Sequence, residues 1–167
     1  AYRYALALTL AQRYGARKLV LHGGYSPRLY YPCWYEEQSI VFWKEFLDTH
    51  PGDYEICLEN VMEESPESLL RIVTQVDDPR LRLCLDVGHV NCYSSVPISQ
   101  WMAQWGDALS HLHLHNNNAS MDSHGGLSRG SLPMEEIIRG IAPHMTATLE
   151  LIEIGDSIHW LKENGFL

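Results

Sequence analysis

Short apolar runs recur along this chain, and each of them ends in an acid or a histidine. In chain order, these segments read LVLHGG, ICLEN, LCLDVGH, LHLHN and ATLE. A carboxylate or imidazole on a buried strand is costly to desolvate unless something pairs with it. Five such endings therefore predict one shared, positively charged partner, and a divalent metal ion is the simplest candidate.

Helix and strand patterns alternate between these runs, which predicts parallel β/α units. Polar residues at the carboxyl ends of such strands lie where sites assemble in β/α barrels and in open α/β sheets. A long polar loop, 116–131, is expected to be functional. A Ser65 hydroxyl is expected to cap the third helix. The expected strands are Lys18–His22, Tyr54–Glu59, Leu81–Asp86, Ala108–His115 and Thr146–Leu151; the expected helices are Tyr2–Tyr14, Glu36–Thr49, Ser65–Val76, Ile98–Trp105, one from Pro133, and Ser157–Asn164.

The two-residue period of a strand predicts which side chains share a face. Cys57 lies on the face of Glu59, Cys84 lies on the face of Asp86, and the three histidines of the LHLHN strand region, at 111, 113 and 115, share one face. Oxygen and imidazole ligands together suit zinc, manganese, iron or magnesium rather than an ion that prefers thiolates. Acting together, four residues are predicted to hold such an ion: Glu59, Asp86, His113 and Glu150.

Length and composition limit the class of protein. With 167 residues the chain is long enough for one core, and we expect residues 1–167 to form a single domain. A net charge of −9 argues against a broad phosphate-binding surface, although bound metals would add local positive charge. No apolar run approaches the roughly 20 residues that span a bilayer, so no membrane partner is expected. The four cysteines lack a disulfide framework, which predicts reduced thiols and a cytoplasmic protein.

These segments together resemble the xylose isomerase-like barrels, a group that includes sugar isomerases, sugar epimerases and endonuclease IV (AP endonuclease family 2). The matching stretches are LVLHGG, LEN, CLDVGHVN, HLHLHNN followed by DSH, TLEL and the closing WLKENGFL. The resemblance implies a (β/α)8 TIM barrel, of which this chain would supply about the last five β/α units, the carboxyl-terminal part. Five parallel strands cannot close a barrel, so the chain is expected to be a fragment that lacks the first three β/α units. The alternative is a half-barrel whose exposed strand edges pair with another chain, as in a homo-oligomer.

The resemblance also implies roles for individual residues. In the isomerase branch, Glu59, Asp86, His113 and Glu150 would hold the metal, and the two glutamates would also be the acid–base pair. His115 shares a face with His113 and is the alternative ligand, with the HLHN register favouring His113. In the endonuclease branch, His22 would join Glu59 at one zinc ion, while His89, Asp122 and His124 would hold another.

Three hypotheses of function follow. The first is a metal-dependent isomerase or epimerase of a small sugar, polyol or sugar phosphate, in which Glu150 or Glu59 removes a proton from carbon and the other returns it. His89 and Arg129 would hold substrate oxygens. The second is an endonuclease IV-like zinc phosphodiesterase at abasic sites, with DNA as the partner; the acidic charge disfavours it. The third is a non-catalytic module that binds metal or sugar.

Overall fold

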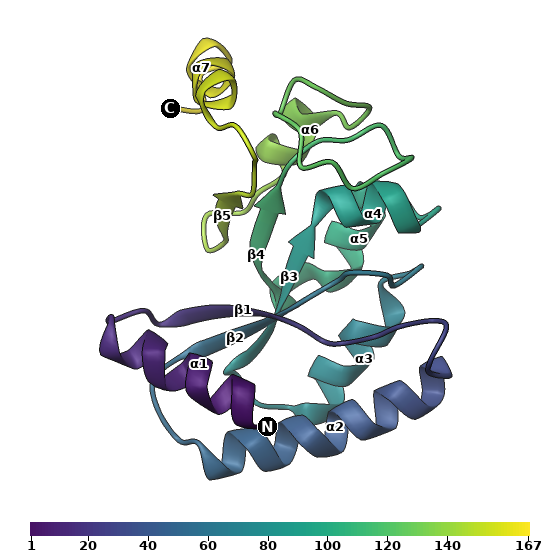
Figure 1. Cartoon of the computed structure of the whole chain (residues 1–167), viewed down its shortest axis with the longest axis vertical. Helices are drawn as coiled ribbons and strands as arrows, with labels where there is room; N and C mark the ends of the chain where they lie inside the picture. Colours follow the sequence, from purple (N-terminus) through teal and green to yellow (C-terminus); the bar gives the residue numbers. More distant parts are fainter.

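The computed structural model describes all 167 residues and confirms the parallel β/α order (Figure 1). The strands form one sheet in the order β1-β2-β3-β4-β5, and every neighbouring pair is parallel. Because each strand pairs with the next one in sequence, the sheet is an open arc of a β/α barrel with β1 and β5 at its edges. The strands are β1 (Lys18–His22), β2 (Glu55–Glu59), β3 (Leu81–Asp86), β4 (Leu109–Leu114) and β5 (Thr146–Leu149).

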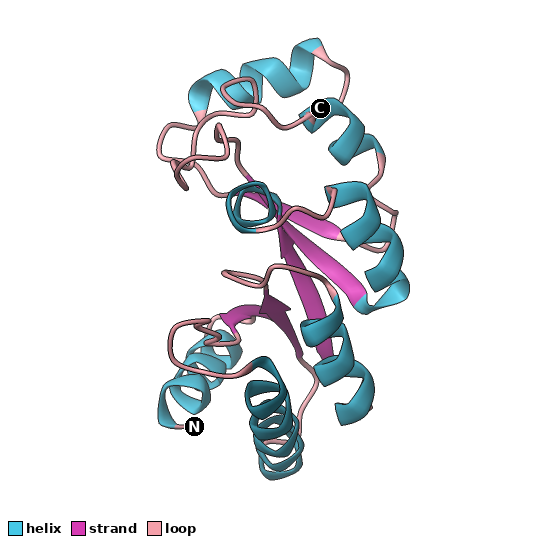
Figure 2. Ribbon diagram, turned by 90° about the vertical axis from the view of Figure 1, so that its right-hand side faces the viewer, coloured by secondary structure: helices cyan, strands magenta, loops and turns pink.

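Helices cover one face of this curved sheet, as Figure 2 shows. They are α1 (Tyr2–Arg13), α2 (Pro32–Thr49), α3 (Glu67–Val76), α4 (Val87–Tyr93), α5 (Ile98–Trp105), α6 (Met134–Arg139) and α7 (Gly155–Glu163). The strand residues that face the helices are buried and apolar, as at Ile56, Leu58 and Leu85. No helix combines the length and the apolar character that a membrane crossing needs. All four cysteines are free thiols.

Four of the six predicted helices begin at a different residue: those expected from Glu36, Ser65, Pro133 and Ser157 begin at Pro32, Glu67, Met134 and Gly155. Helix α2 begins at Pro32 rather than Glu36, because proline suits the first turn, where a helix leaves its N–H groups unpaired. Helix α3 begins at Glu67, and Ser65 makes no cap hydrogen bond to the backbone, so that prediction was wrong. The Ser65 hydroxyl bonds the Glu67 carboxylate instead, which lowers the pKa of Glu67.

Helix α4 was missed altogether. It starts directly after β3, and the Asp86 side chain accepts a hydrogen bond of 2.7 Å from the backbone N–H of His89. Asp86 is therefore at once the last residue of a strand and the N-cap of a helix. Because the strand pattern already accounted for Asp86, no separate sign in the sequence marked the start of a helix there.

An ion network joins the amino ends of strands that are not neighbours in the sheet. The Lys18 ammonium on β1 donates to the hydroxyl and carbonyl oxygens of Ser110 on β4, at 2.7 and 2.9 Å. It also donates to Thr146 on β5 at 3.1 Å and lies 3.1 Å from the Glu55 carboxylate on β2. These contacts cross the interior of the arc and hold its amino-terminal end together.

The loop 116–131 is organised by the side chain of Asn116, which is buried. Its amide N–H groups donate to the carbonyl oxygens of Leu127 and Leu132, and its oxygen accepts from the N–H groups of Asn117 and Leu132. The backbone of Asn116 also exchanges two hydrogen bonds with Gly125. The loop thus has a fixed base although it contains no helix or strand.

We predict that Asn116→Ala lowers the free energy of unfolding by about 2–4 kcal/mol, because several buried backbone groups lose their partners. Urea unfolding followed by circular dichroism measures this change. Asn118→Ala is the matched control, since Asn118 is exposed and bonds only Ser120, and it should change stability by less than about 0.5 kcal/mol. Equal stability of the two variants would contradict the role given to Asn116.

Candidate metal and active site

Four side chains from successive strands meet at the carboxyl-terminal edge of the sheet. Their ligand atoms all lie within 4.8 Å of one another, a spacing compatible with one metal ion. Glu59 ends β2, Asp86 ends β3, His113 lies on β4, and Glu150 directly follows β5. We call Glu59, Asp86, His113 and Glu150 the inner group. They are the four residues that the sequence predicted as a metal site, and the structure brings them together.

The imidazole of His113 faces all three carboxylates through one nitrogen. His113 Nδ1 lies 3.2 Å from Glu59 Oε1, 2.7 Å from Glu150 Oε2 and 3.8 Å from Asp86 Oδ2. Glu59 and Asp86 are buried, while the Glu150 side chain is 43% exposed and closes the group on its open side. One ring nitrogen cannot satisfy three carboxylates, so the arrangement leaves negative charge uncompensated.

The charges of the inner group shift its pKa values in opposite directions. Burial alone would raise the pKa of Glu59, but hydrogen bonds and charge from His113 and His22 outweigh it and lower the pKa to about 2. Burial would lower the pKa of His113, but the hydrogen bond and charge of Glu59, with the charges of Glu150 and Asp86, raise it. Glu59 therefore stays ionised and draws positive charge toward itself.

The inner group fits a divalent cation. Three carboxylates and one imidazole are the donors that zinc, manganese and related ions accept. Glu150 Oε2 is buried and, although close to His113, makes no hydrogen bond of good geometry, as expected of an atom that would contact a metal. In the layer beneath, burial raises the pKa of the Cys84 thiol well above its ordinary value, which keeps thiolate out of the donor group. Burial lowers the pKa of His111 to about 4, and its two ring nitrogens contact threonine hydroxyls.

A second group lies beside the first. Its ligand atoms also lie within 4.8 Å of one another, and three of its members were predicted as an additional metal site. The fourth member is His115, which the sequence left as an alternative to His113. We call His89, His115, Asp122 and His124 the outer group. The structure thus places the two strand histidines in different groups, His113 in the inner one and His115 in the outer one.

His22 and Arg129, the remaining predicted site residues, lie at the margins. His22 is on the edge strand β1, with its Nε2 3.3 Å from Glu59 Oε2. The Arg129 side chain is 63% exposed and pairs with the Asp156 carboxylate, beside a shallow pocket that also contains His124. The structure brings His22 to the inner group but leaves Arg129 on the surface.

Asn60 is a residue of the site that sequence reasoning missed. Its buried side chain accepts from Asp86 N at 2.8 Å and donates to Asp86 O at 3.0 Å, so it fixes the backbone of a predicted ligand. Its own carbonyl oxygen accepts from His89 Nδ1 at 2.8 Å. One sign of this role was present in the sequence, because Asn60 is a polar residue directly after Glu59 at the end of a buried strand.

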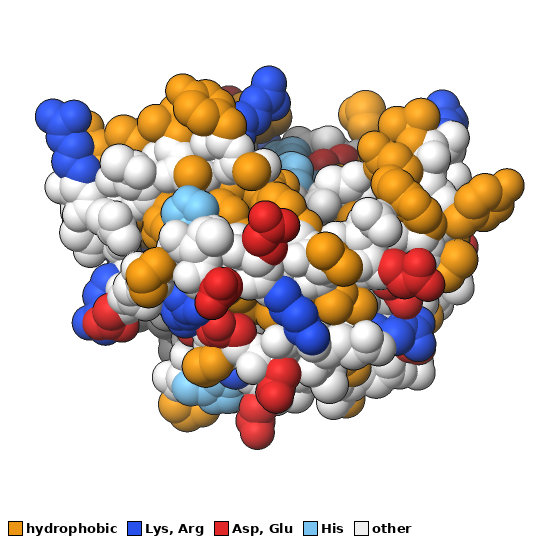
Figure 3. Space-filling model, turned by 90° about the horizontal axis from the view of Figure 1, so that it is seen from below, with side chains coloured by type: hydrophobic (Ala, Val, Ile, Leu, Met, Phe, Trp, Pro, Cys, Tyr) orange, Lys and Arg blue, Asp and Glu red, His pale blue; other side chains and the backbone are white.

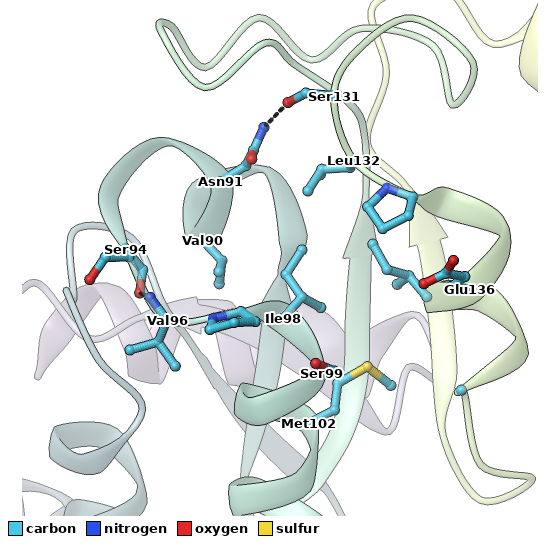
Figure 4. A pocket seen from close by; sticks show the side chains of 15 residues that line it. Val90, Asn91, Ser94, Val96, Ile98, Ser99, Met102, Ser131, Leu132 and Glu136 are labelled. Carbon is cyan, nitrogen blue, oxygen red and sulfur yellow. Dashed lines mark hydrogen bonds between the residues drawn. The ribbon is translucent and has the colours of Figure 1, made fainter.

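The rest of the surface carries less specific features. Figure 3 shows Lys and Arg side chains scattered singly among acidic ones on the face it presents. A cavity of about 510 Å³ lies outside the arc, between α4, α5 and α6, and none of the inner or outer residues line it (Figure 4). We therefore place the candidate chemistry at the carboxyl ends of the strands.

Comparisons with known proteins agree with the β/α-barrel fold. A family model described as "Xylose isomerase-like TIM barrel" matches residues 3–163. An uncharacterized protein of Methanocaldococcus jannaschii, MJ1311, is 29% identical over 131 residues, which are 72% of this chain and 44% of that protein. The structure of a D-tagatose 3-epimerase-like protein is similar with a TM-score of 0.78 and 25% identity, over 95% of this chain and 65% of that one.

A third comparison is with a protein solved after soaking in ZnCl2. This is the TTHB071 protein of Thermus thermophilus, with a TM-score of 0.73 and 25% identity over 92% of this chain and 63% of that one. The present chain thus spans less than two thirds of the length of each of these relatives.

We predict that metal binding at the inner group releases protons near neutral pH. The raised pKa of His113 means that the metal-free protein still holds a proton there above pH 6.5, the ordinary value, and a metal must displace it. Apparent zinc affinity should therefore rise with pH until the raised pKa is passed and then level off. Calorimetric titration in buffers of different protonation enthalpy measures the protons released.

His111→Gln is the control for this experiment, since His111 is already neutral near pH 7 and should leave the proton release unchanged. Zinc affinity that does not vary between about pH 6 and pH 8 would contradict the coupling between His113 and its carboxylates.

Proposed function

This chain belongs to the xylose isomerase-like TIM barrel family, and we propose that it is the site-bearing part of a divalent-metal-dependent isomerase or epimerase of a small sugar or sugar phosphate. One observation carries the proposal: His113 Nδ1 and three carboxylates of successive strands converge within 4.8 Å. The similarity to a D-tagatose 3-epimerase-like protein supports the substrate class. The zinc-soaked relative supports the metal.

In this proposal the ion held by the inner group supplies Lewis acidity to a substrate carbonyl and its neighbouring hydroxyl. Glu150 is the group best placed to take the proton from carbon, because its side chain is 43% exposed and the other three side chains of the inner group are more buried. As the C–H bond breaks, its electron pair shifts toward the carbonyl oxygen. Because Glu59 is ionised before reaction, it would first take a proton from the protonated His22, whose Nε2 lies 3.3 Å from Glu59 Oε2, and then return a proton to carbon.

In this proposal, the side chains around the inner carboxylates, His89 and Arg129, position the substrate. His89 is buried, and its ring faces both groups: its Nδ1 lies 3.7 Å from Glu59 Oε1, and its Nε2 lies 3.1 Å from Asp122 Oδ2. We therefore propose that His89 fixes the wall of the substrate site. Arg129 would reach a substrate only after leaving Asp156, which suits a phosphate or carboxylate at the far end of an extended substrate.

We predict that Glu150→Gln lowers turnover by about 100- to 10,000-fold, because glutamine cannot accept a proton. Incorporation of deuterium from D2O into ketohexoses, D-tagatose first among them, measures the proton transfer by NMR in the zinc- or manganese-loaded full-length protein. The exposed Glu163→Gln should exchange at the wild-type rate. Sugar binding without exchange in the wild type would instead indicate the non-catalytic binding module.

A second candidate function is an endonuclease IV-like phosphodiesterase, and the outer group favours it. His115 of that group lies 2.9 Å from Asp86 of the inner group, so ions in both groups would be neighbours, as in multi-metal phosphodiester sites. The net charge of −9 disfavours a DNA substrate.

Cleavage of abasic-site duplex DNA separates the two candidate functions. The nuclease hypothesis predicts cleavage by the zinc-loaded protein that Asp122→Ala abolishes. The isomerase hypothesis predicts no cleavage above the metal-only background. Cleavage lost in Asp122→Ala, with no deuterium exchange into any sugar, would overturn the isomerase proposal.

A further inference from the structure

The cavity between α4, α5 and α6 takes no part in the candidate active site. Its volume of about 510 Å³ lies within the roughly 300–1,000 Å³ of small-molecule sites. No residue of the inner or the outer group lines it. All of its lining residues lie between 90 and 140, in consecutive β/α units, so the open edges of the sheet at β1 and β5 do not border it.

The floor of this cavity is apolar. Val90, Ile98 and Ile137 line it although they are only 3%, 9% and 5% exposed, so the cavity reaches the hydrophobic core. Met102 and Leu132, which are partly buried, continue this apolar surface. Figure 4 shows these side chains of α4, α5 and the segment before α6 around one space. An apolar ligand that covered them would release water from apolar surface, which favours binding.

Hydrogen bonds fix the walls of the cavity at two places. In the connection between α4 and α5, Ser94 Oγ accepts from Val96 N at 3.0 Å and from Trp101 Nε1 at 3.2 Å. At the other place, Asn91 Nδ2 on α4 donates to Ser131 Oγ at 3.0 Å, the bond that Figure 4 marks. The helices are therefore held in position without a ligand, and a largely pre-formed cavity is typical of small-molecule sites.

A single ionisable side chain lines the cavity, and it is an acid. Glu136 in α6 is exposed and makes no hydrogen bond or ion pair with the protein. Its neighbour Glu135 instead pairs with Arg139 at 2.8 Å. No Lys, Arg or His lines the cavity, so no protein group there neutralises Glu136. The cavity therefore attracts a cation and repels an anion.

Two serine hydroxyls add hydrogen-bond acceptors to the same cavity. Ser95 and Ser99 line it, are exposed, and make no side-chain hydrogen bond within the protein. An ammonium group carries three N–H donors, which is more than one carboxylate oxygen satisfies, and a hydroxyl oxygen accepts such donors. The polar groups of the cavity thus suit an ammonium better than a carboxylate or a phosphate.

We propose that the cavity between α4, α5 and α6 binds a small organic cation that has an apolar body and an ammonium group. The apolar body would cover Val90, Ile98 and Ile137, and the ammonium would pair with Glu136. A sugar phosphate would meet like charge at Glu136, so this ligand differs in class from the substrate proposed for the inner group. The proposal concerns binding outside the arc and holds whichever reaction the inner group performs.

Three compounds with the same phenyl body and different head groups test the proposal. They are 2-phenylethylammonium, 2-phenylethanol and 3-phenylpropionate, which are cationic, neutral and anionic. Titration into the nitrogen-15-labelled full-length protein, followed by NMR, gives the affinity of each compound and the place where it binds. We expect the ammonium compound to bind most tightly and the carboxylate most weakly, with amide shifts in α4, α5 and α6.

Variants separate the charge of the cavity from its volume. Glu136→Gln should weaken binding of the ammonium compound by about two- to fivefold and leave the alcohol unchanged. Glu135→Gln is the matched control, because Glu135 pairs with Arg139 and does not line the cavity, and it should bind like the wild type. Ser99→Leu introduces a larger side chain into the cavity from an exposed helix position and should weaken all three compounds.

Several results would overturn the proposal. They are equal affinity for the three compounds or binding of none, an equal loss in Glu135→Gln and Glu136→Gln, and affinity that Ser99→Leu leaves unchanged. Self-association that Ser99→Leu abolishes, without binding of any compound, would assign the cavity to a second copy of this chain instead.

Discussion

Glu59 and Asp86 are carboxylates buried at the carboxyl ends of two adjacent parallel strands, where almost no water reaches them. The groups near them compensate for that desolvation. His113 approaches three acids through one nitrogen, His22 approaches from the sheet edge, and the backbone N–H of His89 donates to Asp86. The same desolvation cost favours imidazoles at the carboxyl-terminal edge of the sheet, because an imidazole can be neutral or can carry a positive charge beside the acids.

Asp86 shows how much a single buried acid can organise. It closes β3, caps α4, belongs to the inner group and accepts from His115 of the outer group. Asn60 holds its backbone by two hydrogen bonds. The inner and outer groups are therefore not two independent sites on a common scaffold. They are joined through one carboxylate. A substitution at Asp86 would therefore affect β3, α4, the inner group and the outer group together.

The sequence predicted the parts of this structure that depend on pattern. Apolar runs marked every strand, and the position of acids and histidines at the strand ends brought Glu59, Asp86, His113 and Glu150 to one edge. Parallel strands in sequential order make that convergence almost unavoidable, which is why it could be foreseen. The partial barrel was implied by the resemblance to the xylose isomerase-like barrels, and the pairing of each strand with the next along the chain confirms it.

What escaped prediction depends on contacts between distant residues. The sequence could not tell that His115 turns away from His113, because both share a strand face and only contacts with Gly88 and Asp122 distinguish them in space. Helix α4 and the role of Asn60 were missed for a related reason. A residue that serves two elements, or one that bonds backbone 26 positions away, leaves no local pattern.

The Lys18 network gives the open sheet a property that strand pairing alone cannot. Its ammonium reaches β4 and β5 from β1, across the hollow of the arc and past the strands between them. The strands are therefore held together at their amino ends. Glu59 and Glu150 lie at the opposite, carboxyl ends, where the strands diverge. We therefore expect the separation of Glu59 and Glu150 to depend on Lys18, a cation at the opposite end of the strands that contacts neither of them.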